Sequence, residues 1–358
     1  METACRADRD GRERYSRFRR LSFCFDGGDD FSGRAGDIFH VAGGDPLAAF
    51  AYSVAGGDTG ATGCVAIMKV LVLGSKGRLG GALARMWAPD YEVRGLARPE
   101  LDVADLPALG KLLESESYDV LVNCTGLTNV DRCERDREEA EVVNARAPGV
   151  MAQDAAAKGS RFIHFSTDYV FDGAKTTPYT EDDEAHPLSH YGRTKLEGER
   201  AALAPSARHM AVRVAWVFGR DKPSFVDQII ERALANDHVE AIANKTSCMT
   251  FTEDVSRWLR PFLDGDLPGG IYHMCNTGGC SWHEYGQFAL DFAARTGLPL
   301  KARKVEPISL SDLKAFVAPR PPHTEVSTAK FTAVTGMAPR RWQEAVEEYL
   351  GRKLIRLR

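Results

Sequence analysis

The sequence contains a tyrosine and a lysine at a spacing suited to proton transfer. Tyr191 and Lys195 lie four residues apart in the segment Tyr-Gly-Arg-Thr-Lys, so a helix would carry both side chains on one face. A nearby ammonium stabilises a phenolate and lowers the pKa of the tyrosine. The phenol can then give its proton to a carbonyl oxygen while a hydride reaches the carbonyl carbon. Because ordinary solvated helices show the same spacing, the surroundings of the pair decide its role.

A hydroxyl-bearing segment upstream of this pair follows a predicted strand. The mostly apolar run 161–165 is predicted as a buried strand, and Ser-Thr-Asp-Tyr-Val-Phe-Asp-Gly over 166–173 comes directly after it. Open α/β sheets hold ligands at the carboxyl ends of their strands. We therefore expect the hydroxyl of Thr167 to bond a substrate carbonyl oxygen.

A glycine-rich turn near the start of the periodic sequence predicts a dinucleotide site. Gly74, Gly77 and Gly80 have the G-x-x-G-x-x-G spacing, after a predicted strand and at the start of a helix. This arrangement lets the backbone approach a pyrophosphate at the positive end of the helix. NAD-specific sites usually carry an acid at the end of the second strand, and here none comes before Glu100. We therefore expect NADPH, with NADH as the alternative. The cations placed to meet a 2′-phosphate are Lys76, Arg78 and Arg98.

Strands and helices alternate from Met68 onward. The alternation predicts an α/β fold with a Rossmann-type, doubly wound parallel sheet. The expected strands are 69–73, 91–95, 120–123, 161–165, 211–217 and 271–274, and the expected helices are 79–87, 106–114, 137–158, 191–203, 225–236 and 339–350. Beyond about residue 236 the order loosens. We expect an NAD(P)-binding domain over 68–236 and, over 237–358, mainly a small substrate-binding lobe whose chain returns to the sheet.

The first 67 residues have a different character. They hold eleven of the 33 glycines and eight arginines but no lysine, and they lack strand or helix periodicity. Scattered acids and the absence of a continuous apolar segment argue against transit and secretory signals. We interpret 1–67 as a disordered or mis-assigned extension, with the true start at Met68.

The overall composition excludes several classes of protein. The 358 residues carry a formal net charge of −4 and a pI of about 6.2, so there is no general attraction to nucleic acid or anionic lipid. No run of eighteen apolar residues suggests a membrane span. The eight cysteines form no C-x-x-C pair and no trusted zinc spacing, so we expect a cytoplasmic protein without a metal site. The arginines at 132, 135 and 137 alternate with acids, which predicts a salt-bridged helix face.

Taken together, these motifs resemble an extended short-chain dehydrogenase/reductase. The segments that carry the resemblance are the glycine turn, Val-Asn-Cys-Thr-Gly at 122–126, the 166–173 segment, the Tyr and Lys pair, and Leu-Glu-Gly-Glu at 196–199. They are most similar to the dTDP-4-dehydrorhamnose reductase family of sugar-nucleotide reductases, over essentially all of 68–350. The resemblance implies that NADPH or NADH reduces the C4 keto group of a dTDP-linked deoxysugar.

The resemblance also implies a role for individual residues. Tyr191 would donate the proton, Lys195 would orient the ribose, and Thr167 would bond the substrate oxygen. The implied cofactor contacts are Gly77, Arg78 and Leu79 at the pyrophosphate, Asp102 and Val103 at the adenine, and Gly126 and Thr128 at the nicotinamide. The implied substrate contacts are Asp168 at the sugar, Trp216, and Arg320 near the nucleotide. A nucleotide sugar would be the partner, and a homodimer is one arrangement left open.

Two departures from the family pattern fall in the substrate lobe. Where the family commonly shows Asp-Gln-x-Gly-x-Pro-Thr, residues 244–250 read Asn-Lys-Thr-Ser-Cys-Met-Thr. Glu325 places an acid near an expected anionic nucleotide and would repel a diphosphate unless it points away or binds a sugar hydroxyl. Two other hypotheses stay open: a sugar-nucleotide epimerase or dehydratase, and a non-catalytic NADP-binding regulatory subunit. Tyr169, where dehydratases tend to carry Glu, disfavours dehydration.

Overall fold

The computed structural model describes residues 67–354. The extension predicted for 1–67 lies outside the described residues, apart from Ile67. In the part of the chain that is described, no helix has the length and apolar character needed to cross a membrane.

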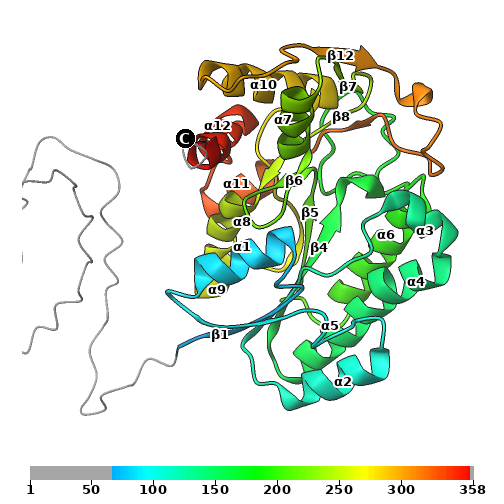
Figure 1. Cartoon of the computed structure of the whole chain (residues 1–358). Helices are drawn as coiled ribbons and strands as arrows, with labels where there is room; N and C mark the ends of the chain where they lie inside the picture. Colours follow the sequence, from blue (N-terminus) through cyan, green and yellow to red (C-terminus); the bar gives the residue numbers. More distant parts are fainter. Residues whose placement is uncertain (1–66, 355–358) are drawn as a thin grey trace, which may run out of the picture. The chain divides into compact units, whose positions relative to one another are not determined.

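Six parallel strands form the central sheet (Figure 1), in the order β10-β5-β4-β3-β1-β2. This order confirms the predicted doubly wound α/β fold. Strands are added on both sides of β1, so the switch point lies between β1 and β3, where ligands bind beyond the carboxyl ends. The bounds are β1 Lys69–Leu73, β2 Glu92–Leu96, β3 Val120–Asn123, β4 Arg161–Thr167, β5 Met210–Val214 and β10 Gly270–His273.

Alternating strand residues bury the two faces of the sheet. Val70 and Val72 of β1 pack into one apolar cluster, whereas Leu71 and Leu73 pack into another. Helices α1 (Arg78–Trp87), α8 (Thr252–Trp258), α9 (Arg260–Asp264) and α11 (Ala329–Thr335) supply the first cluster. The other face is covered by α2 (Leu106–Ser115), α5 (Ala147–Ala157) and α6 (His190–Leu203), with α3 (Val130–Arg135) and α4 (Arg137–Glu141) beside them (Figure 1).

Two predicted elements differ from the structure. The helix expected over 137–158 is interrupted by a π-helical turn at Val142–Arg146 between α4 and α5. The turn places Asn144 inside, where its Oδ1 accepts a hydrogen bond from the backbone N–H of Leu127 at 2.9 Å. The strand expected over 211–217 ends at Val214, because Trp216 adopts a left-handed backbone with φ of 37°.

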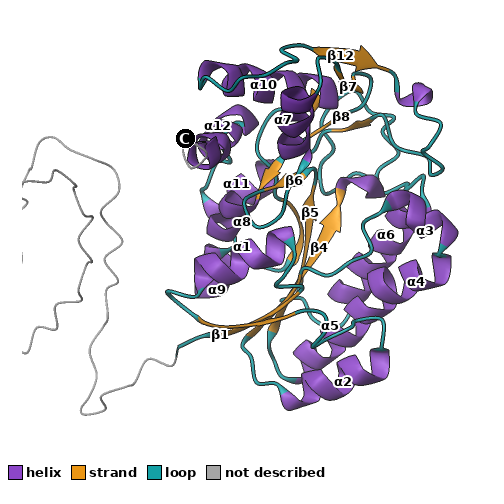
Figure 2. Ribbon diagram, viewed as in Figure 1, coloured by secondary structure: helices purple, strands orange, loops and turns teal. Residues whose placement is uncertain are grey.

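The remaining strands form three small sheets, and the side chains of this part build a separate apolar core. Most of these elements lie at the top of Figure 2. Their strands are β6 Val217–Phe218, β7 Val239–Ile242, β8 Thr246–Ser247, β9 Thr250–Phe251, β11 Cys280–Ser281, β12 Val305–Ile308 and β13 His323–Thr324. Helices α7 (Phe225–Ala235), α10 (Trp282–Arg295) and α12 (Trp342–Leu354) pack into this core. The last helix begins later than predicted because the residues before it run extended beside Thr277. The domain boundary at residue 236 stays a prediction, although β10 does return to the sheet.

Candidate active site

The proton-donor candidate and the strand-end hydroxyl meet where β4 ends and α6 begins. Thr167 is the last residue of β4, and Tyr191 lies in the first turn of α6, which Ser189 caps by accepting from the N–H of Gly192 at 3.2 Å. The phenol of Tyr191 is buried, and the Thr167 side chain lies close enough to lower the pKa of that phenol. The ring of Tyr169 packs edge-on against it, with 5.7 Å between centroids. The structure therefore brings together the two oxygens expected at a substrate carbonyl.

Lys195 lies one turn further along α6, and its ammonium contacts β4. Its Nζ donates to the carbonyl oxygen of Phe165 at 2.6 Å and lies 3.2 Å from Nε2 of His164. Burial lowers the pKa of Lys195 to about 8, against the opposing effect of the Glu199 carboxylate. The expected lowering of the Tyr191 pKa by Lys195 is not what the structure shows. Burial raises that pKa, and the group that lowers it is the Thr167 hydroxyl.

A buried polar network extends from Lys195 through His164 to Asn123 and Thr125. The backbone N–H of Thr125 and its hydroxyl both donate to Oδ1 of Asn123, at 2.9 and 2.6 Å. The Nδ2 of Asn123 then faces Nδ1 of His164 at 3.1 Å. Burial lowers the pKa of His164 far enough to keep the ring neutral at pH 7. Sequence reasoning missed this role of His164, although a polar residue inside a buried strand was a usable signal.

The glycine turn forms a cradle at the end of β1. Gly74 has φ of 84°, and a Cβ on Gly80 would lie 2.3 Å from the carbonyl oxygen of Gly74. A cavity of about 340 Å³ opens over the turn between the ends of β1, β2 and β3. A backbone cradle of this kind, below a cavity at the switch point, fits a dinucleotide. The predicted cofactor residues that line the cavity are Gly74, Gly77, Val103 and Gly126.

Three predicted cofactor residues occupy other positions. Leu79 is buried in the core below α1, so its backbone alone faces the turn. Asp102 is exposed and accepts from the N–H of Ala104 at 3.1 Å, and Thr128 is exposed. Their contacts with a cofactor stay predictions.

The cations expected at a 2′-phosphate divide into two groups. Lys76 and Arg98 line the cavity, and Lys76 lies 3.6 Å from Glu100. Arg78 instead donates to the carbonyl oxygens of Lys222, at 3.2 Å, and Pro223. In this structure Arg78 therefore ties the 222–223 loop to the start of α1.

On the substrate side, the carboxylate of Asp168 accepts hydrogen bonds from three side chains of this chain. Its Oδ2 accepts from the hydroxyls of Ser247, at 2.8 Å, and Thr324, and its Oδ1 accepts from Thr167 at 3.1 Å. Asp168 therefore joins β4 to β8 and β13, and its implied sugar contact stays a prediction. Glu325 accepts from the N–H of Gly279 at 2.9 Å, so its carboxylate is engaged within this chain, and its effect on a nucleotide stays a prediction.

Arg320 is paired with an acid that sequence reasoning did not single out. The guanidinium donates to both carboxylate oxygens of Asp131, at 3.1 and 2.6 Å, and stacks 3.6 Å from the Phe316 ring centroid. The Arg320 side chain holds the pKa of Asp131 at about 2, against the opposing effect of burial. The backbone N–H groups of Val317 and Ala318 also donate to Asp131. This pair fixes the 317–320 segment against α3.

Trp216 lies in an aromatic wall next to β5. Its ring contacts those of Trp282, with 5.3 Å between centroids, and Tyr285, and it lines a cavity of about 120 Å³ with Phe225. The indole N–H is buried without a hydrogen-bond partner. An unpaired donor beside a cavity is consistent with the implied substrate contact.

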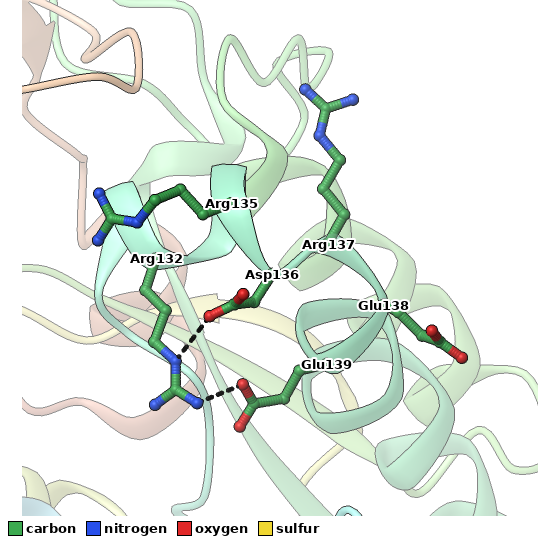
Figure 3. Close-up of a pocket in the computed structure, with 6 residues that line it drawn as sticks. All are labelled: Arg132, Arg135, Asp136, Arg137, Glu138 and Glu139. Atoms are coloured by element: carbon green, nitrogen blue, oxygen red, sulfur yellow. Dashed lines mark hydrogen bonds and ion pairs between the residues drawn. The ribbon is translucent and has the colours of Figure 1, made fainter.

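A polar hollow on α3 and α4 is an ion-pair surface (Figure 3). Arg132 lies 3.2 Å from Asp136 and also contacts Glu139, as the alternating charges predict. In Figure 3, Arg135 and Arg137 point away from Arg132 and its two acidic partners. Within residues 67–354, no three His, Cys, Asp or Glu side chains gather as a metal ion would need.

The fold, the cradle and the Thr, Tyr and Lys set define a Rossmann-fold, NAD(P)-dependent oxidoreductase. The family model described as the RmlD substrate binding domain matches residues 68–355. The chain therefore belongs to this family, and the resemblance to the dTDP-4-dehydrorhamnose reductases is confirmed.

Individual relatives agree with this assignment. A dTDP-4-dehydrorhamnose reductase of Mycolicibacterium smegmatis is 35% identical over 288 residues, which cover 79% of this chain and 85% of the relative. The crystal structure of a reductase of the same name from Clostridium acetobutylicum is 29% identical, with a TM-score of 0.75 over 80% of this chain and 100% of its own. A third, from Bacillus anthracis in complex with NADP, is 24% identical, with the same TM-score and coverage.

Proposed function

We propose that this protein reduces the C4 keto group of a dTDP-linked 6-deoxysugar with NADPH, and that the substrate is dTDP-4-dehydrorhamnose. The observation that carries the proposal is the buried contact between Tyr191 and Thr167 at the carboxyl end of β4, with only β3 between β4 and the strand that leads into the glycine cradle. Family membership and the named relatives support the choice of substrate. NADH stays the alternative cofactor.

The residues of this chain perform the proton half of the reaction. When bound, a reduced nicotinamide supplies the hydride. The phenol of Tyr191 carries the proton that would be transferred to the keto oxygen of the substrate. The Thr167 hydroxyl would hydrogen-bond to the same oxygen. Burial raises the pKa of Tyr191, so the phenol stays protonated at neutral pH until the keto oxygen gains negative charge. Lys195 lies on the same face of α6 as Tyr191, and its ammonium donates to the carbonyl oxygen of Phe165. From this position the ammonium would donate a hydrogen bond to a ribose hydroxyl of the cofactor.

The local chemistry disfavours a dehydratase and a regulatory subunit. A dehydratase of this superfamily needs a further acid and base pair, and the residue after Asp168 is Tyr169, whose pKa is raised by burial. That phenol is a poor base at neutral pH. Product analysis separates an epimerase from a reductase. A regulatory subunit would not need the Tyr191 and Thr167 contact.

The proposal includes a cytoplasmic enzyme whose partner is a nucleotide sugar rather than nucleic acid or a membrane. The five cysteines within the described residues are all free thiols, which suits a reducing compartment. A homodimer is part of the proposal, and sedimentation of the full chain would test it.

Product analysis separates the three functions. The full chain is incubated with NADPH and dTDP-4-dehydrorhamnose generated in situ, and the nucleotide sugars are identified by NMR. We expect dTDP-rhamnose in equal amount to the NADPH oxidised. A changed sugar without NADPH oxidation would indicate an epimerase or dehydratase. Tight NADPH binding with an unchanged sugar would favour the regulatory subunit.

A further inference from the structure

The loop between β7 and β8 contains a fully buried lysine. Lys245 has 0% of its surface exposed and stands where the family pattern has glutamine. A buried ammonium is costly unless nearby groups compensate its charge, so its surroundings bear on its role.

Lys245 contacts two segments on the substrate side of the site. Its Nζ donates to the carbonyl oxygen of Pro321 at 2.6 Å, directly after Arg320. It also lies 4.8 Å from the ring centroid of Tyr169, the residue that packs edge-on against Tyr191. One side chain therefore connects the arginine segment to the neighbour of the catalytic phenol.

The two residues after Lys245 contact the same segment. The N–H of Thr246 donates to the carbonyl oxygen of Pro322 at 2.7 Å, and β8 pairs in parallel with β13. Ser247 and Thr324 share the Oδ2 of Asp168. Lys245 is the only charged side chain in this three-residue stretch, so its charge is what sets it apart from its neighbours.

We propose that Lys245 is a positioning residue whose charge holds the Arg320-Pro321 segment against Tyr169, and so sets the arrangement that binds the nucleotide sugar. The carboxylate of Asp168 favours the charged form of Lys245, whereas Arg320, itself paired with Asp131, opposes it. A neutral glutamine could meet the carbonyl but would supply no charge over the Tyr169 ring.

Lys245 loses its charge within a pH range that experiments can reach. Burial lowers its pKa to about 8 from the ordinary 10.5. The ammonium is therefore present at pH 7 and lost as the pH rises through about 8. The groups that face it are Asp168 and Tyr169 from the end of β4 and Arg320 from its own segment. Above that pH the attachment of the Arg320-Pro321 segment to Lys245 should weaken.

Amide hydrogen exchange in the cofactor-free full chain tests the hold without any turnover. The reporter amides are those of Thr246, Val317 and Ala318, which are hydrogen-bonded within the arrangement. At pH 7 we expect protection factors at least about tenfold lower in Lys245→Gln and Lys245→Met than in the parent. At pH 9 the three proteins should converge. Equal protection of the reporter amides at pH 7 would overturn the proposal. The control is the amide of Cys124, directly after β3, which donates to the carbonyl oxygen of Leu73; its unchanged protection would show that the central sheet is intact.

A kinetic arm rests on the proposed function and distinguishes positioning from general destabilisation. We expect Lys245→Gln to raise KM for the nucleotide sugar at least about tenfold, with KM for NADPH within about twofold. The ratio of the variant's KM for the sugar to the parent's should be high at pH 7 and fall toward one as the pH rises above 8. Lys195 is unchanged in both proteins, so its own titration affects both KM values and cancels in this ratio. Equal KM values would overturn the role in substrate binding. A parent that oxidises no NADPH would refute the proposed function, and the exchange result would still decide the hold.

Discussion

Replacing Glu199 by glutamine should destabilise the protein strongly. Glu199 accepts from Nε and Nη2 of Arg213 at 2.9 and 2.7 Å, and the two side chains are 1% and 3% exposed. Glutamine keeps the shape but offers one acceptor and turns an NH₂ group toward the guanidinium. Arg213 would then stay buried without its bidentate carboxylate partner, beside His273 and the Phe171 ring. Breaking a buried pair from one side costs about 3–5 kcal/mol.

Thermal and urea unfolding measure this cost directly. A loss of about 3–5 kcal/mol corresponds to a fall in Tm of roughly 6–20 °C for a domain of this size. The double variant Glu199→Gln with Arg213→Met removes both charges and should recover most of the loss. A single variant within about 1 kcal/mol of the parent, or a double variant no better than the single one, would refute the reasoning.

The same variant should alter the pH dependence of activity. Glu199 raises the pKa of Lys195, which burial holds at about 8. Removing the carboxylate lowers that pKa further, so the ammonium is lost at a lower pH. We expect the alkaline limb of kcat to move to lower pH in Glu199→Gln. An unmoved limb would mean that the charge of Lys195 does not depend on Glu199.

Two further predictions concern the cofactor cradle and the substrate arm. Gly80→Ala places a Cβ 2.3 Å from the carbonyl oxygen of Gly74, so NADPH affinity by fluorescence titration should fall at least about tenfold. The matched variant Gly110→Ala, with nothing within 4 Å of the new atom, should bind NADPH normally, and equal affinities would contradict the cradle. Asp131→Asn should raise KM for the nucleotide sugar but not for NADPH, because Arg320 loses its carboxylate. Since the pKa of Asp131 is held at about 2, its contribution to stability is present above about pH 4 and declines as the pH falls toward 2.

The strands of the central sheet were predictable because short apolar runs between amphipathic helices have few other interpretations. The break after β5 was not, since the left-handed backbone of Trp216 depends on the aromatic wall against which its ring packs. The π-helical turn likewise arises from tertiary contacts of Asn144 rather than from helix propensity.

At the site, sequence spacing predicted which residues approach one another but not how they are directed. Thr167 and Tyr191 meet as expected, because a strand end and a helix start converge there. The direction of Lys195 is set by His164 and the Phe165 carbonyl, contacts that no local spacing reveals. The pair of Arg320 with Asp131 spans 189 residues of sequence and was equally hidden.

The most direct test of the central claim is the steady-state oxidation of NADPH by the full chain with dTDP-4-dehydrorhamnose, beside Tyr191→Phe. If the phenol protonates the keto oxygen, the parent oxidises NADPH and the variant loses about 10²–10⁴-fold in kcat with NADPH affinity unchanged. A variant that turns over at the parental rate would contradict the assignment of Tyr191 as the proton donor.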